Sequence, residues 1–139
     1  MDFKYTSDLD SLIPRLETAL DRSIDLSLQE LWGNVMQNSP RDPKNGRLAG
    51  SWTYRKTGFM SGFVGTNVHY ALIQNDGVDP FMIYPRSKQA LHWPGADHPV
   101  TEVMHPGFAG TQYIEGSIAQ AEGRHSDFVH HALSEVNLI

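Results

Sequence analysis

The sequence predicts an α+β fold, because its helical and extended segments are grouped along the chain instead of alternating. A stripe of apolar residues recurs every three or four positions near the N-terminus. The middle of the chain holds short extended runs separated by Pro, Gly and Asp, and helical spacing returns in the last third. Strands clustered between helices are typical of α+β domains. A chain of 139 residues has the size of one domain, so we expect a single domain over 1–139.

A long amphipathic helix is predicted over residues 10–37. Its apolar positions run from Leu9 to Val35 in steps of three and four, which places them on a single face. Pro14 is compatible with a first helical turn, and Ser39 before Pro40 is a stop signal. A helix of this length in so small a domain is expected to pack on a sheet, on a neighbouring subunit, or on both.

The segment that follows, "SPRDPKNGRLAG" (39–50), is predicted to be a turn-rich loop. Alternating aromatic and polar residues predict a strand at about 51–57, and a second strand is expected at 63–68. We expect Gly62 and Gly65 to allow close approach of that strand to other backbone. A short helical turn over 70–75 is expected to close at Asp76-Gly77 and to be locked onto the sheet by Tyr70, Leu72 and Ile73.

Three short extended pieces, "FMIYP", "ALHWP" and "VTEVMHP", predict a hairpin or extended arm whose ends are fixed by prolines. The last third returns to helical spacing, with Gly123 separating two helices or kinking one. The complete prediction is a long N-terminal helix packed on a small antiparallel sheet, an extended hairpin arm, and C-terminal helices.

The composition excludes several kinds of chemistry. The chain has no Cys, so disulfides, thiol catalysis and thiolate metal sites are excluded. A net charge of −5 argues against a protein that binds nucleic acid tightly, although an acidic surface would let DNA slide past without binding. The N-terminus lacks the pattern of a secretion signal, and no apolar run approaches the length of a membrane span. We expect a soluble intracellular product without membrane contact.

The search for catalytic or metal-binding motifs finds little. His125, His130 and His131 lie near Asp127, but the spacing brings at most two ligands to one helix face, fewer than a zinc site needs. A His-dependent metalloenzyme is kept as an alternative, and a polar helix face near a subunit contact is favoured. The chain has neither a Gly-x-Ser-x-Gly elbow nor a phosphate-binding loop. We therefore expect no enzyme activity and no cofactor.

Three motifs in order resemble a known family. They are "NSPRDPKNGRLAGSW", "VGTNVHYALIQNDG", and "IYPRSKQALHWPG" followed by "VTEVMHPGFAGTQYIEGSI". Together they cover about residues 10–122 and resemble the neck and tail-completion proteins of tailed bacteriophages, often labelled putative tail component, minor capsid or morphogenesis protein. The turn around Lys44 is longer than the commoner version, the approach to the closing helix is less apolar, and residues 123–139 lie outside the match.

The resemblance implies a structural virion protein made in the host cytoplasm and placed at the head–tail junction. It implies a ring, by family analogy a hexamer or dodecamer, that contacts portal, adaptor or head-completion proteins on one side and tail-tube or terminator proteins on the other. DNA would be contacted only non-specifically in passing. A minor capsid or decoration protein of the phage head remains an alternative within the structural class.

A ring needs two different complementary faces on each subunit. Aromatic side chains and Met are favoured at interface cores, which makes the predicted arm a candidate face, although these residues could equally be half-buried sheet positions. The face of the N-terminal helix or the basic loop could supply the other face. The basic loop could instead contact an acidic partner or be a solvated loop. The candidate interface residues are Arg41, Lys44, Arg47, Phe81, Met82, Ile83, Tyr84, Arg86 and Trp93.

Overall fold

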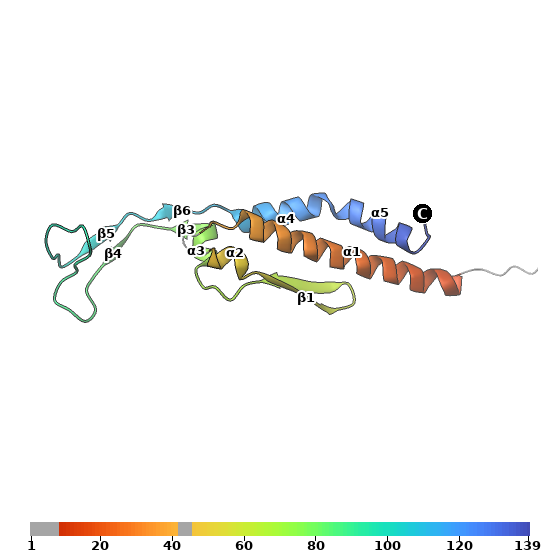
Figure 1. The fold of residues 1–139 in the computed structure, drawn as a ribbon, viewed down its shortest axis with the longest axis horizontal. Helices are drawn as coiled ribbons and strands as arrows, with labels where there is room; N and C mark the ends of the chain where they lie inside the picture. Colours follow the sequence, from red (N-terminus) through yellow and green to blue (C-terminus); the bar gives the residue numbers. More distant parts are fainter. Residues whose placement is uncertain (1–8, 42–45) are drawn as a thin grey trace, which may run out of the picture. The chain divides into compact units, whose positions relative to one another are not determined.

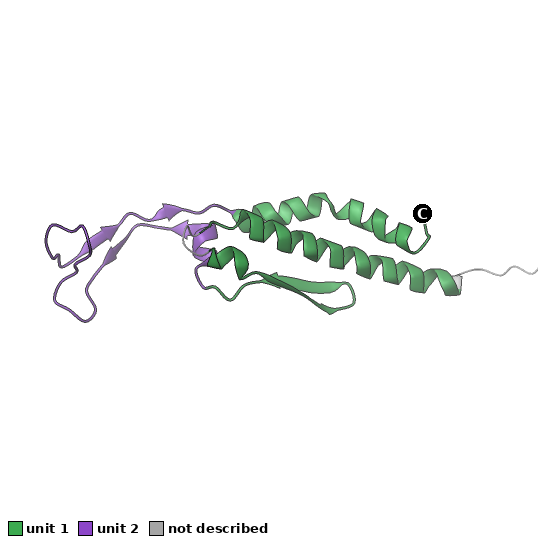
Figure 2. Cartoon of the chain, viewed as in Figure 1, with its two compact units in different colours: residues 1–68, 113–139 green, residues 69–112 purple. Residues whose placement is uncertain are grey.

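The computed structural model describes residues 9–41 and 46–139 and confirms the α+β prediction (Figure 1). The chain divides into two compact units (Figure 2). Unit 1 contains residues 1–68 and 113–139, and unit 2 contains residues 69–112. The assignment of 1–139 to one domain stays a prediction, and the two units are described separately.

Unit 1 is built around α1 (Leu9–Asn38), which confirms the long helix predicted over 10–37. In Figure 1, α1 lies between the C-terminal helices on one side and the β1–β2 hairpin on the other. The helices are α4 (Tyr113–Gly123) and α5 (His125–Glu135), separated at Arg124, directly after Gly123, close to where the sequence predicted. The hairpin pairs β1 (Thr53–Gly58) with β2 (Ser61–Gly65) in antiparallel register.

The prediction of a single apolar face on α1 is wrong in one respect. Because elements cover α1 on two sides, the fully buried positions include the small residues Ala19 and Ser23, which lie outside the predicted stripe. Ala132 of α5 is also buried, and small side chains allow two helices to approach closely. Leu12 and Leu16, which belong to the stripe, are exposed.

Polar and aromatic contacts in the core of unit 1 surround Trp52. Its indole Nε1 donates to Ser39 Oγ at 2.9 Å, and its carbonyl accepts from Trp32 Nε1 at 2.8 Å. The Trp52 ring also meets Tyr113 of α4 edge-on, with centroids 6.2 Å apart. The end of α1, the start of β1 and the start of α4 are therefore held together at one point.

The hairpin packs on α1 through a glycine. A Cβ atom at Gly62 would lie 2.3 Å from Leu28 Cδ1 of α1 and 2.7 Å from the Arg55 carbonyl oxygen, so no larger residue fits without movement. This confirms the expected close approach at Gly62. At Gly65 a Cβ atom would meet only ordinary contacts, so the same expectation is wrong there. The register also shifts between Lys56 and Gly58, as in a bulge.

Helix α5 ends in a left-handed cap. Asn137 has φ +55°, the Leu138 amide donates to the Leu133 carbonyl at 3.0 Å, and the Asn137 amide donates to Ser134 O at 3.1 Å. This is the geometry of a Schellman motif. The Arg15 guanidinium of α1 donates to the Val136 carbonyl at 2.6 Å and to the Asn137 carbonyl at 2.7 Å, which satisfies the end of α5 from outside.

Unit 2 contains the predicted hairpin arm. After α3 (Ala71–Asp76), β3 (Gly77–Val78) pairs with β6 (Phe108–Ala109), and β4 (Phe81–Ile83) pairs with β5 (Val103–His105). Both pairs are antiparallel, and a single bridge between Leu91 and Val100 follows further along. The chain thus runs out and back as one long hairpin.

Three local expectations need correction. The segment Arg47–Gly50 is a short helix, α2, and not a turn. The strands form three separate two-stranded ladders and not one small sheet, and β2 ends at Gly65 and not at Val68. Leu72 and Ile73 are exposed, so they do not lock α3 in place; its buried residues are Ala71 and Asn75.

Candidate functional site

The arm carries an apolar groove of about 350 Å³. Ile83 on β4 is paired with Val103 on β5, so both side chains point to the same face of the ribbon. Residues from the loop beyond the strands complete the groove. The arm groove is lined by Ile83, Leu91, His92, Trp93, Val103, Met104, His105 and Pro106.

The structure places three of the six predicted arm residues at this groove or its margin. Ile83 and Trp93 line it, and Trp93 is 43% exposed. Phe81 stacks on the lining residue His105, with ring centroids 4.9 Å apart and planes 18° apart. Tyr84 is 59% exposed and Met82 is half-buried. Of the predicted arm residues, two are therefore half-buried (Met82 and Ile83), and the others are exposed.

His105 has a defined hydrogen bond. Its Nδ1 accepts from the Gly107 amide at 3.0 Å, which assigns the ring proton of the neutral imidazole to Nε2. Gly107 has φ +71°, and a Cβ atom there would lie 2.2 Å from the Val78 carbonyl oxygen, so the turn requires glycine. The stacked Phe81–His105 pair is thus fixed at the margin of the groove from both strands of the hairpin.

The predicted basic loop is only partly described. Lys44 lies outside the described residues. Arg41 is exposed and lines a groove of about 550 Å³ with Trp32, Met36 and Ala49. Arg47 is exposed at the start of α2 and does not line that groove. Arg86, the basic residue predicted for the arm, is exposed in the loop after β4.

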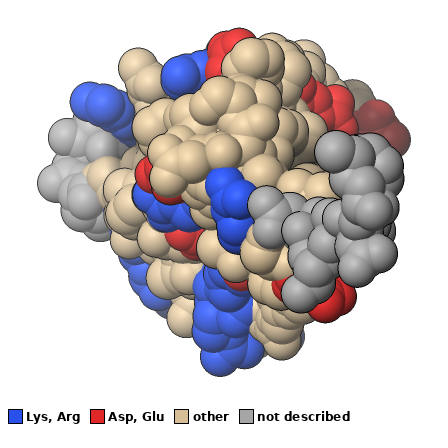
Figure 3. Space-filling model, turned by 90° about the vertical axis from the view of Figure 1, so that its right-hand side faces the viewer, with Lys and Arg blue, Asp and Glu red and all other residues tan. Residues whose placement is uncertain are grey.

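A second apolar surface lies at the start of α1, on the N-terminal helix whose face is a candidate for the other ring contact. Leu12, Ile13 and Leu16 are spaced so that they share one helix face, and Ile13 is 54% exposed. We call these three residues the helix-end patch. Figure 3 views the molecule from the side on which α1 begins, and most of the described surface in that view is neither acidic nor basic. The periodic stripe was visible in the sequence, but its exposure was not.

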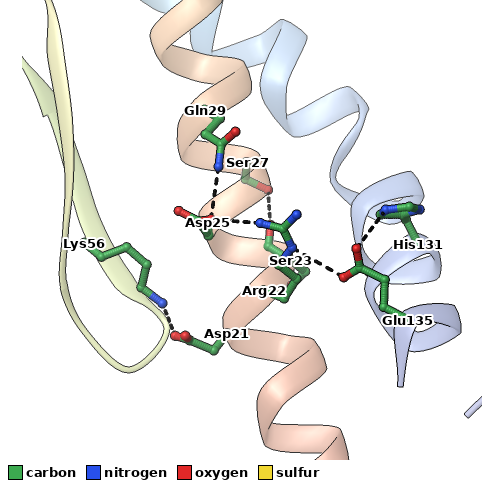
Figure 4. A network of polar contacts seen from close by, with 9 residues as sticks. All are labelled: Asp21, Arg22, Ser23, Asp25, Ser27, Gln29, Lys56, His131 and Glu135. Atoms are coloured by element: carbon green, nitrogen blue, oxygen red, sulfur yellow. Dashed lines mark hydrogen bonds and ion pairs between the residues drawn. The ribbon is translucent and has the colours of Figure 1, made fainter. Parts of the chain in front are cut away.

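Beyond the helix-end patch, polar side chains link α1 to its neighbours (Figure 4). Asp21 pairs with Lys56 of β1 and accepts from the Met60 amide at 2.7 Å. The Lys56 hydrogen bond, and then the Met60 amide, hold the pKa of Asp21 below its usual range. Met60 has φ +51°, so Asp21 also holds a left-handed turn residue of the hairpin.

The same network reaches α5. Arg22 donates to Asp25 at 3.1 Å and to Glu135 at 3.4 Å, and Glu135 lies 3.2 Å from His131. The groove beside this network is about 630 Å³ in volume and is lined by charged groups of both signs. Asp21, Asp25 and Glu135 each have a basic partner, which is the arrangement of a structural network that joins α1 to β1 and α5.

The His-rich C-terminal helix does not gather metal ligands in the part of the chain that the structure describes. There, no group of three or more His, Cys, Asp or Glu side chains is placed to hold a metal ion. His125 Nδ1 lies 2.8 Å from Ser27 Oγ of α1, and His131 is paired with Glu135. No helix among the described residues is long and apolar enough to cross a membrane.

Comparison with known proteins returned no match: no protein-family model, no curated protein and no solved structure is significantly similar to this chain.

Proposed function

We propose that this chain is a structural subunit of a tailed-phage virion, a head–tail connector of the neck, tail-completion or tail-terminator type that assembles into a ring. The position at the head–tail junction rests on the three ordered motifs within residues 10–122. The assembly rests on one structural observation: each of the two compact units exposes an apolar surface, the helix-end patch on unit 1 and the arm groove on unit 2.

Two different apolar surfaces on one chain fit a head-to-tail assembly. A ring closes by rotation when one face of a subunit meets a different face of the next. Exposed aromatic side chains and Met, such as Tyr84, Trp93 and Met104, are enriched at the cores of such contacts. A stable contact buries at least about 1,000 Å² in total, which requires more than one small patch. A six-fold or twelve-fold ring is part of the proposal by family analogy.

The charge of the chain fits a channel through which DNA passes. A net charge of −5 disfavours tight contact with phosphates and would lower friction for a moving duplex. The partners in this proposal are further copies, portal, adaptor or head-completion proteins on the head side, and tube or terminator proteins on the tail side. The mechanism is docking between complementary surfaces, without a reacting centre.

A gene deletion in the phage that encodes the chain tests the proposal. We expect filled heads and separate tails in the lysate, because the junction cannot close, and restored infectious particles when the chain is supplied from a plasmid. Mass spectrometry of purified virions should detect the chain in multiple copies. Normal infectious particles from the deletion strain, or virions without the chain, would refute the proposed function.

A further inference from the structure

We propose that His105 is a pH-sensitive switch in the arm: its neutral imidazole holds the turn at Gly107, and a second proton on the ring releases that turn. The switch is a property of the single chain and does not depend on the proposed ring assembly. Two observations carry it, a break in the ribbon of the arm and the hydrogen bond that His105 makes at this break.

The break lies between the two ladders of the arm. The last pair of the β3–β6 ladder and the first pair of the β4–β5 ladder are three positions apart on both strands, so the two ladders share one register. The two pairs missing between them would join Asp79 to Gly107 and Pro80 to Pro106. Because Pro has no amide N–H, neither proline can donate to a ladder. The ribbon is therefore interrupted where two prolines lie opposite each other.

A side chain makes a hydrogen bond at this break. The Gly107 amide donates to Nδ1 of His105, the first residue of the β4–β5 ladder on its strand. The turn at Gly107 is tight, since its φ is +71° and a Cβ atom there would lie 2.9 Å from the Pro80 nitrogen on the opposite strand. One imidazole nitrogen thus ties β5 to a turn that packs against the other half of the ribbon.

Protonation of His105 removes this hydrogen bond. The bond requires a free lone pair on Nδ1, whereas a protonated imidazole carries hydrogen on both ring nitrogens. Two N–H groups then face each other, and the Gly107 amide loses its acceptor. Histidine is the side chain that ordinarily changes its charge between about pH 5 and 8, so mild acid is sufficient for this change.

The stack with Phe81 determines which side of the break is released. The two rings are 4.9 Å apart and nearly parallel. Because a cation over the face of an aromatic ring is attracted to it, a charged His105 stays on Phe81 and the β4–β5 ladder keeps this contact. The Gly107 turn is then the part that moves. The β3–β6 ladder beyond it has only two residue pairs and loses support.

The charged neighbours of His105 come from three segments. Asp79 lies across the break, Glu102 precedes β5, and His92 of the outer loop lines the same groove. Strand β4, which pairs with β5, contains only Phe, Met and Ile. Among the described residues, His105 forms no ion pair. No salt bridge there offsets the hydrogen bond that the charged ring loses.

Amide hydrogen exchange of the full chain, followed by NMR at about pH 5 and about pH 8, tests the switch. Protection factors are compared, because they remove the intrinsic dependence of exchange on pH. We expect the protection of the Gly107 amide, and of the β3 and β6 amides, to fall roughly three- to tenfold at the lower pH, as for the loss of one hydrogen bond. Amides of α1 near Val35 provide the reference and should not change.

Two variants separate the proton from the packing of the ring. His105→Asn retains a side-chain acceptor that does not titrate, and His105→Phe retains an aromatic ring for the stack but has no acceptor. We expect the pH dependence at Gly107 to disappear in both, with higher protection in His105→Asn than in His105→Phe. The matched control is His92→Asn, which changes the other histidine of the groove and should keep the pH dependence of the original chain.

Circular dichroism confirms that the variants fold. Equal protection of Gly107 at the two pH values in the original chain would refute the switch, and so would a pH dependence that persists in His105→Phe or disappears in His92→Asn. Each of these results is independent of whether virions contain the chain, so the switch and the proposed function can fail separately.

Discussion

At the scale of single residues, Trp52 joins three elements of unit 1. Its indole donates to Ser39 Oγ, and its ring packs against Tyr113. We expect Trp52→Phe to lower the free energy of unfolding by about 1–3 kcal/mol, because the hydrogen bond and part of the buried volume are lost. Urea unfolding followed by circular dichroism measures the change.

The control for this substitution is Trp93→Phe. Trp93 is exposed on the arm, so its replacement should change the free energy of unfolding by no more than about 0.5 kcal/mol. Equal losses in the two variants would contradict the role assigned to Trp52.

A second residue-scale prediction concerns alkaline pH. Burial, and then the nearby Glu115 carboxylate, raise the pKa of Tyr113 above its ordinary value of about 10, although a hydrogen bond with Ser39 opposes the shift. The folded chain therefore keeps this proton at a pH where the unfolded chain releases it. The contribution of Tyr113 to the free energy of unfolding is therefore fully present below about pH 10 and is lost as the pH rises towards the raised pKa.

Urea unfolding between pH 8 and 11 measures this effect. We expect the free energy of unfolding to fall less steeply with pH in Tyr113→Phe than in the original chain, while Tyr84→Phe, at an exposed position, keeps the original slope. Identical slopes in all three proteins would show that Tyr113 does not titrate differently in the folded state.

At the scale of elements, the hairpin depends on close approach to α1 at Gly62. We expect Gly62→Ala to lower the free energy of unfolding by about 1–3 kcal/mol, because the added methyl group meets Leu28 and the backbone of β1. Gly58→Ala is the matched control in the same hairpin, since an added Cβ atom there has no neighbour within 4 Å. Thermal unfolding of the two variants compares them, and a more stable Gly62→Ala protein would contradict this packing.

The elements that the sequence predicted well are those with many repeats of a local pattern. Helix α1 is 30 residues long and carries apolar periodicity over most of its length, and Gly123 marks the end of α4. Helix α2 has only four residues and strand β3 only two, too few for any period to appear. Strand pairing depends on distant partners, so the local pattern could not distinguish one sheet from three separate ladders.

At the scale of the whole molecule, exposure was the property that local patterns did not predict. The stripe of α1 continues from its first turn to Val35, yet Leu12, Ile13 and Leu16 are exposed and Val35 is buried. The periodicity is the same at both ends, and the difference depends on which neighbouring elements cover each turn. Pro and aromatic residues mark the arm locally, and the periodic stripe marks the face of α1 as a candidate contact surface. Only the tertiary structure shows that the exposed part of that face is its beginning.

The arm also gives a prediction for the complete molecule, free and assembled. Its ladders are only two and three residue pairs long, and its large side chains include exposed Phe81, Tyr84 and Trp93, so few contacts oppose local opening. In the free chain we expect backbone amides over residues 78–106 to exchange with deuterium much faster than those of α1. In the assembled particle the same amides should become protected, because a neighbouring subunit covers them.

Hydrogen exchange with mass spectrometry compares the two states, and α1 residues near Val35, already buried in the single subunit, provide the internal reference. Equal protection of residues 78–106 in the free and assembled states would show that the arm is not an assembly surface.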